Sequence, residues 1–275
     1  MRLIKSYGVA IACWAAVCSA HAAIVITGTR VIYPEGSREV NVRLSNVEAR
    51  PVLVQAWLDE GNPAASPDEV QVPFVLLPSV FRVEPHRGQS LRIMFTGAEL
   101  PKDRESVYWL NVLEIPPKPE RAEERNLIQL AFRTRIKLFY RPAGLDDDPT
   151  AARSQLGWRI VANEGGERVL RVDNPSPYYV SLGSVALEAG GSKTVLRPDM
   201  APPFGHVDLV PDKGRLDAGL PATVSYGVLN DFGTEIKDSA QVGDAKRVRQ
   251  TAQATGGAGV DVEAAADAEK ITEIQ

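Results

Sequence analysis

The chain has 275 residues, with 31 Lys and Arg against 35 Asp and Glu, and a formal net charge of −4 at pH 7. Proteins that bind nucleic acid normally carry a basic excess, so this balance argues against a nucleic-acid partner. The length is sufficient for two domains of ordinary size.

The first 22 residues have the features of a cleavable secretory signal. A basic start at Met1–Lys5 precedes a short apolar run over Val9–Val17, and Ala20-His21-Ala22 has the A-x-A form of a cleavage site. An uncleaved membrane anchor is the alternative, but a span needs about 20 apolar residues. We therefore expect a mature chain that begins at Ala23, lies in the periplasm and does not insert into the membrane.

Both cysteines, Cys13 and Cys18, lie inside this signal. The mature chain would then have none, although its compartment permits disulfides. Its cohesion is expected to come from its hydrophobic core and its hydrogen bonds.

The first half of the mature chain reads as a series of short strands. Apolar and polar residues alternate, or β-branched residues cluster, between Pro and Gly turns. The expected strands are Val40–Leu44, Val52–Leu58, two within Ser79–Phe95 separated by a turn at Pro85–Gly88, Ser106–Ile115, and Leu127–Tyr140.

A Pro, Gly and Asp-rich stretch, Arg141–Pro149, interrupts this pattern before strand-like runs resume. The second set comprises Trp158–Val161, Arg168–Val172, Tyr178–Val185, Thr194–Leu196, His206–Val210 and Thr223–Leu229. From about Ala240 the chain turns to Ala, Gly, Gln and charge. This predicts an all-β protein with an N-terminal domain at 23–141, a linker at 142–149, a C-terminal domain at 150–239 and a disordered tail at 240–275.

Two segments carry a family resemblance. Leu100–Pro117 reads LPKDRESVYWLNVLEIPP, and Asn126–Pro142 reads NLIQLAFRTRIKLFYRP. In order and separation they resemble the signature and the following strand of the periplasmic pilus-assembly chaperones, the PapD-like family of chaperone–usher systems. The resemblance implies two immunoglobulin-like β-sandwich domains, set at an angle around a cleft.

The resemblance also assigns a role to Ile128, Leu130 and Phe132. In the family, alternating apolar residues of this strand complete the fold of a pilin subunit by donor-strand complementation. From alternation alone, the same segment is a half-buried strand that covers its own core, and that alternative stays open.

Two further sets of residues match the family. Arg30 and Lys137 correspond to the cations that hold the C-terminal carboxylate of the bound subunit, a chemistry suited to Arg and Lys. Glu105, Arg141 and Asp231 correspond to an interdomain salt-bridge network. The alternative for both sets is ordinary surface charge.

The implied function is a periplasmic chaperone that stabilises pilin (fimbrial) subunits and passes them to an outer-membrane usher. The exposed strand edge of the free protein is expected to allow self-association. The alternative is a structural pilin or adhesin subunit of the fibre itself, which would usually lack a final strand.

We expect no enzyme activity, cofactor or metal. There is no G-x-S-x-G, and a Ser-His or Cys-His site is poorly supported, because only His86 and His206 remain after processing. Gly190–Thr194 superficially resembles a phosphate-binding loop but lacks the required spacing, so we expect a hairpin turn. Asp146–Asp148 could bind calcium, although an acidic linker is the favoured interpretation.

Overall fold

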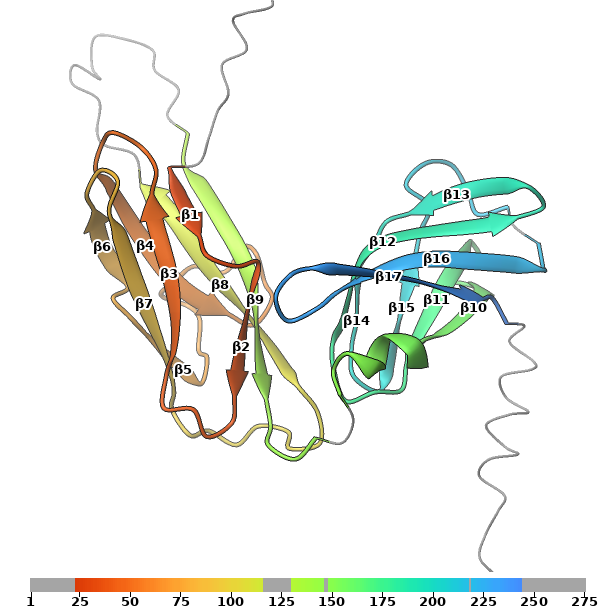
Figure 1. Ribbon diagram of the computed structural model, residues 1–275, viewed down its shortest axis with the longest axis horizontal. Coiled ribbons are helices and arrows are strands. Elements are labelled where there is room, and N and C mark those ends of the chain that lie inside the picture. The colour runs from red at the N-terminus through yellow and green to blue at the C-terminus, as the bar shows by residue number, and fades with distance from the viewer. Residues whose placement is uncertain (1–22, 116–129, 146–147, 218, 244–275) are drawn as a thin grey trace, which may run out of the picture. The chain divides into compact units, whose positions relative to one another are not determined.

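The computed structural model describes residues 23–115, 130–145, 148–217 and 219–243 (Figure 1). They divide into two compact units. The first holds the chain up to Pro149 together with Pro177–Tyr179 and Leu229–Glu235, and the second holds the remainder. The boundaries expected from sequence, by contrast, were continuous ranges. Among the described residues, no helix is long and apolar enough to cross a membrane.

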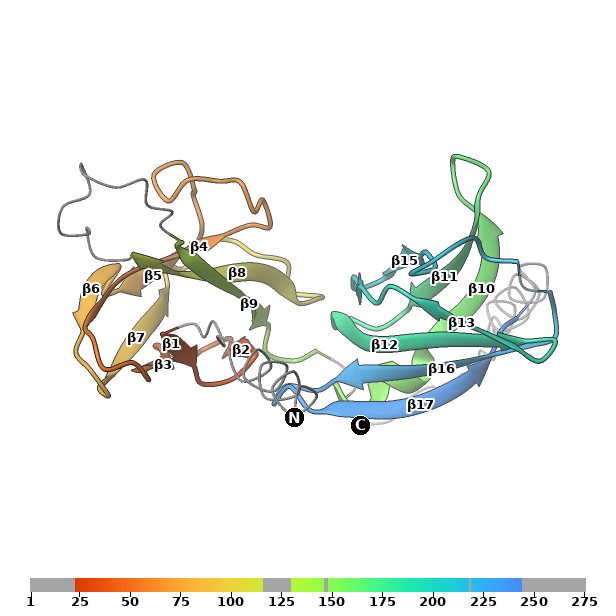
Figure 2. The same cartoon turned by 90° about the horizontal axis from the view of Figure 1, so that it is seen from above.

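The first unit is a sandwich of two sheets, visible as facing layers in Figure 2. One sheet has the order β1-β3-β7-β5, with bounds Ile24–Ile26, Val40–Asn46, Gly88–Phe95 and Phe74–Leu77. The other has the order β2-β9-β8-β4-β6, with bounds Arg30–Pro34, Phe132–Arg141, Ser106–Ile115, Val52–Asp59 and Val80–Val83. The β2–β9 pair is parallel, and the other pairs are antiparallel.

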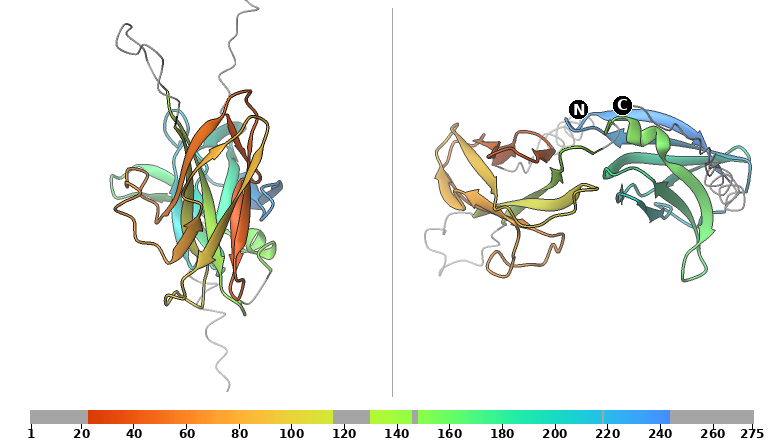
Figure 3. Two further views of the ribbon diagram at one scale, coloured as in Figure 1. Left: turned by 90° about the vertical axis from the view of Figure 1, so that its left-hand side faces the viewer. Right: turned by 90° about the horizontal axis from the view of Figure 1, so that it is seen from below.

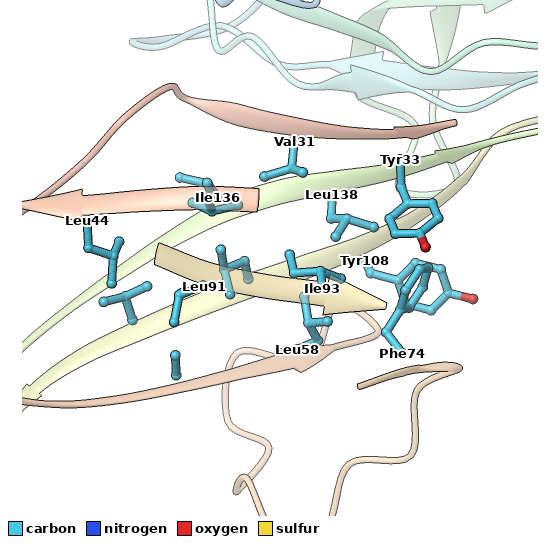
Figure 4. Close-up of a cluster of buried hydrophobic side chains, with 14 of the residues drawn as sticks. Val31, Tyr33, Leu44, Leu58, Phe74, Leu91, Ile93, Tyr108, Ile136 and Leu138 are labelled. Atoms are coloured by element: carbon cyan, nitrogen blue, oxygen red, sulfur yellow. The ribbon is translucent and has the colours of Figure 1, made fainter. Parts of the chain in front are cut away.

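The core of this unit follows from the two-residue period of its strands. In β7, Leu91 and Ile93 are fully buried while Arg92 between them is exposed. Figure 4 shows these side chains between the two sheets, with Leu44 and Leu138 among their neighbours.

Aromatic rings close one end of the first core. Phe74 meets Tyr108 edge-on at a centroid distance of 5.0 Å, and Phe95 lies 4.7 Å from Tyr140. Tyr33, whose ring appears beside Phe74 in Figure 4, donates its hydroxyl to the Ser37 carbonyl and accepts the Phe95 amide. The buried hydroxyl is therefore satisfied in both directions.

The second unit has its own two sheets, seen from two further sides in Figure 3. The three-stranded sheet has the order β10-β11-β15, with bounds Gly157–Ala162, Arg168–Asn174 and Gly205–Leu209. The larger sheet has the order β13-β12-β16-β17, with bounds Ser192–Leu196, Val180–Ala189, Ala222–Leu229 and Glu235–Gln241, and β14 (Met200–Ala201) pairs with β12. A 3-10 helix, η2 (Ala151–Gln155), precedes β10, and Trp158 packs 4.7 Å from Tyr226 in the core.

The all-β prediction is confirmed, and each strand expected from sequence overlaps a strand of the structure. The strand expected from Leu127 differs at its start, because β9 begins at Phe132 and residues 127–129 lie outside the described residues. Gly190 and Gly191 form the β12–β13 hairpin, as expected, with positive φ angles.

The last strand of the second unit runs past residue 239, the end that the sequence predicts for this domain. β17 continues to Gln241, Val242 is buried, and the Gly243 amide donates to the Trp158 carbonyl at 2.9 Å. The ordered chain therefore extends past the expected boundary at residue 239. The rest of the expected tail, residues 244–275, lies outside the described residues.

Replacement of Leu91 by Ala tests the assignment of the first core. The side chain is fully buried, so the cavity is expected to lower the free energy of unfolding by about 2–5 kcal/mol. Val80→Ala, at a position of β6 that is 55% exposed, is the control and should change it by less than about 0.5 kcal/mol. Urea unfolding followed by circular dichroism measures both, and equal effects would contradict this core.

Candidate functional site

The inward face of β9 is buried at one end of the strand and exposed at the other. Ile136 and Leu138 are 8% and 0% exposed and belong to the core of the first unit. Phe132 is 40% exposed, and Leu130, two residues before the strand begins, is 66% exposed. In extended chain, every second side chain lies on the same face. The face that covers the core at one end is thus solvent-exposed at the other.

The same end of β9 also has an edge with which no described strand pairs. β8 pairs with β9 from Phe132 to Tyr140, but β2 pairs with it only from Lys137 to Arg141 (Figure 1). Among the described strands, none covers the other edge of residues 132–136. Backbone groups on such an edge are available to a strand from another chain.

Arg30 and Lys137 are brought together by strand pairing. In the parallel ladder between β2 and β9, these two residues are direct partners. The Arg30 guanidinium lies 5.7 Å from the centre of the Phe139 ring and donates to the Leu229 carbonyl at 3.1 Å. Burial lowers the pKa of Arg30, while Asp231 and Glu105 act to raise it. The Lys137 ammonium lies 5.4 Å from the centre of the Trp109 ring.

The outer face of β9 rests on a cluster that sequence reasoning missed. Arg135 lies 4.3 Å from the centre of the Trp109 ring and forms an ion pair with Asp59, the last residue of β4. Asp59 also accepts hydrogen bonds from Asn111 and from the Gly61 amide, both at 2.6 Å. Because this polar cluster depends on residues from three strands, the local pattern of no single strand signals it.

The protonation of Asp59 follows from these contacts. Burial acts to raise the pKa of this carboxyl, since it removes water from the charged form. The hydrogen bonds from Arg135, Asn111 and Gly61 outweigh burial, so the pKa of Asp59 lies below its ordinary value. The carboxylate therefore stays charged and holds Arg135 in place at neutral pH.

Glu105, Arg141 and Asp231 also meet, and all three belong to the first compact unit. Arg141 donates through Nε to Glu105 at 2.7 Å and through its two terminal nitrogens to Asp231 at 2.7 and 2.9 Å. Glu105, nearly fully buried, accepts a further bond from the Tyr179 amide at 2.9 Å. Burial raises the pKa of Glu105, against the opposing effects of Arg141 and the Tyr179 amide.

A tight turn presents Asp231 to Arg141. Asn230 accepts hydrogen bonds at its side-chain oxygen from the Phe232 and Thr234 amides, at 3.0 and 2.9 Å. Gly233 has a φ of +80°, and a Cβ atom there would lie 2.2 Å from the Thr29 hydroxyl. Glycine is therefore needed for both the backbone conformation and the close approach.

Two sequence expectations fall on residues that the structure describes only in part. Ile128 lies outside the described residues, as do Asp146 and Asp147 of the possible calcium site. Within the described ranges, no group of three or more His, Cys, Asp or Glu is arranged to hold a metal ion.

Family models match both halves of the chain. Residues 23–146 match "Pili and flagellar-assembly chaperone, PapD N-terminal domain", and residues 151–240 match "Pili assembly chaperone PapD, C-terminal domain".

Individual relatives agree with these models. The probable fimbrial chaperone YadV of Escherichia coli is 46% identical over 235 residues, covering 84% of this chain and 95% of the relative. The chaperone FimB/FhaD of Bordetella pertussis is 45% identical over 230 residues, covering 82% and 91%. The crystal structure of YadV superposes with a TM-score of 0.69 at 44% identity, covering 80% of this chain and all of that one. The chain therefore belongs to the PapD-like family of pilus-assembly chaperones.

Proposed function

We propose that this protein works in the periplasm, where it binds newly exported pilin subunits through β9 and the segment before it, and delivers them to an outer-membrane usher. The observation that carries the proposal is the divided inward face of β9, buried at Ile136 and Leu138 but exposed at Phe132 and Leu130. Periplasmic location and usher delivery rest on the predicted signal and on family membership.

The exposed segment offers a subunit two kinds of interaction. Its free edge over residues 132–136 can form main-chain hydrogen bonds with an incomplete sheet, while Leu130 and Phe132 can fill a groove. Burial of a large apolar side chain is worth roughly 1.5–3 kcal/mol. A subunit that lacks a strand would gain both, which agrees with the predicted donor role of Ile128, Leu130 and Phe132.

Arg30 and Lys137 supply a fixed reference point for this interaction. We propose that the pair binds the C-terminal carboxylate of the subunit, Arg30 through its planar fork and Lys137 as a point charge. Lys137 is five residues from Phe132, or roughly 17 Å along an extended strand. A carboxylate held here would set which subunit residues meet Phe132 and Leu130.

Solved relatives support the pilin as partner. One structure is of the Salmonella enterica pilin SafA in complex with the chaperone SafB, and this chain resembles it at 28% identity with a TM-score of 0.67, covering 82% of this chain and 99% of that one. The relatives named as fimbrial chaperones favour this role over the alternative of a fibre subunit. We also propose that the role is one of binding, without catalysis.

The anchor can be tested by Lys137→Gln and Arg30→Ala, each co-expressed with a candidate pilin. Loss of a charge-assisted hydrogen bond should lower pilin affinity roughly 10- to 100-fold while the chaperone stays folded. Arg82→Ala, which removes an exposed arginine of β6, is the matched control. Co-purified pilin yield and a binding titration measure the effect.

A change in the subunit distinguishes an anchor from a general cation effect. A pilin extended by one residue moves its carboxylate away from the pair, so it should lose affinity for the wild type but little for Lys137→Gln. Equal losses for both chaperones would contradict carboxylate binding.

Leu130→Glu tests the donor face. The side chain is 66% exposed in the free protein, so a charge there should leave the unfolding midpoint unchanged but lower pilin capture at least tenfold. Val80→Glu, on β6, is the control for an added exposed charge. If Leu130→Glu instead lowered thermal stability as much as capture, Leu130 would belong to the protein's own core.

A further inference from the structure

Glu114 links the two sheets of the first unit at the end where β9 is exposed. It lies on β8 and is only 7% exposed, and its neighbours in the ladder are Val54 of β4 and Phe132 of β9. Its carboxylate accepts the Ala23 amide at one oxygen and the Ile24 amide at the other, each at 3.0 Å. We call Glu114, Ala23 and Ile24 the N-terminal clasp.

The clasp is anchored from the opposite sheet as well. Ile24 is buried and pairs with Asn46 in the ladder between β1 and β3, and the Ala23 carbonyl accepts the Val47 amide at 2.9 Å. The backbone nitrogen of Ala23 is thus held beside the carboxylate by contacts on both sides.

Glu114 has no cationic side-chain partner within the part of the chain that the structure describes. Among the described residues, no Lys, Arg or His forms an ion pair with it. Buried carboxylates are almost always paired with a cation, because two neutral amides compensate only part of the lost hydration. The buried Asp59, by contrast, has Arg135.

We propose that Glu114 is a binding site for the α-ammonium group that leader removal creates at Ala23. Hydrolysis by a leader peptidase adds one water across the Ala22–Ala23 amide. The water oxygen goes to the new carboxylate of Ala22, and both hydrogens go to the Ala23 nitrogen, which becomes –NH₃⁺. In the folded protein this cation would take the position of the Ala23 amide nitrogen, which lies 3.0 Å from a Glu114 oxygen.

Leader removal should then strengthen the hydrogen bond between Ala23 and Glu114. A neutral amide hydrogen bond becomes a charge-assisted one, which is roughly twice as strong. The buried carboxylate gains its counter-charge only when Ala23 is the first residue. The stability of the first unit therefore depends on where the leader is cut. This inference rests on the predicted cleavage site but not on pilin binding.

A double-mutant cycle tests the coupling. One change inserts Gly-Ser between Ala22 and Ala23, which keeps the A-x-A site but turns the Ala23 ammonium into an amide after cleavage. The other is Glu114→Gln. All four proteins are exported with their own leader, their first residue is established by intact mass, and unfolding equilibrium constants are measured in urea.

Each single change should raise the unfolding equilibrium constant roughly tenfold. The double variant should have about the same unfolding constant as either single variant. Effects that multiply, or an extension that changes nothing, would overturn the proposal. Glu84→Gln, at an exposed carboxylate that pairs with Arg82, is the control and should show no coupling to the extension.

A second measurement covers the case in which Glu114→Gln does not fold. The rate of acetylation of the Ala23 α-amine in the folded wild type should be at least tenfold below its rate in the urea-unfolded protein. Equal rates would overturn the proposal. A chain that retains its leader would show by mass that cleavage had failed. Pilin capture by the wild type reports separately on the proposed function.

Discussion

The register of β9 is the constraint on which the other features of the first unit depend. Ile136 and Leu138 are buried against the facing sheet, and burial of each contributes roughly 1.5–3 kcal/mol. A slip by one residue would turn both toward solvent, so the register is strongly specified. With this register, Phe132 and Leu130 extend past the core on the same face. The same register places Lys137 beside Arg30.

The polar face of β9 reinforces this placement from the other side of the sheet. Arg135 is held by a buried carboxylate on β4 and by the ring of Trp109 on β8, so the strand is linked to its second neighbour as well as its first. Asp59 can remain buried because its charge is met by Arg135, Asn111 and the Gly61 amide together. The exposed end thus continues from a strand that is held on both faces, and this would limit the entropy lost if a partner strand bound.

The sequence predicted the strands whose own residues alternate or are rich in β-branched side chains, such as β7 and β8. It did not predict β17, whose burial alternates only between exposed and half-buried positions and whose place depends on pairing with β16. Three-residue β1 was too short to show a period. Arg30 and Lys137, which the family resemblance treats as one anchor, are direct partners in the β2–β9 ladder; the anchor role itself stays a prediction. The Asp59–Arg135 pair, 76 residues apart, has no local signature, because it depends on the order of strands in the sheet.

An exposed apolar strand end is also an aggregation hazard, and the sequence around β9 limits it. Arg133, Arg135 and Lys137 alternate with the apolar residues on the opposite face of the strand. Two copies of this edge brought together would place these cations near one another, and edge strands commonly use such charges against self-pairing. The ion pair of Arg135 with Asp59 cancels part of this charge. A subunit that contributes a carboxylate beside Lys137 would instead be attracted. The same cations would therefore weaken the self-association that the exposed edge leads us to expect, and they would favour the proposed partner.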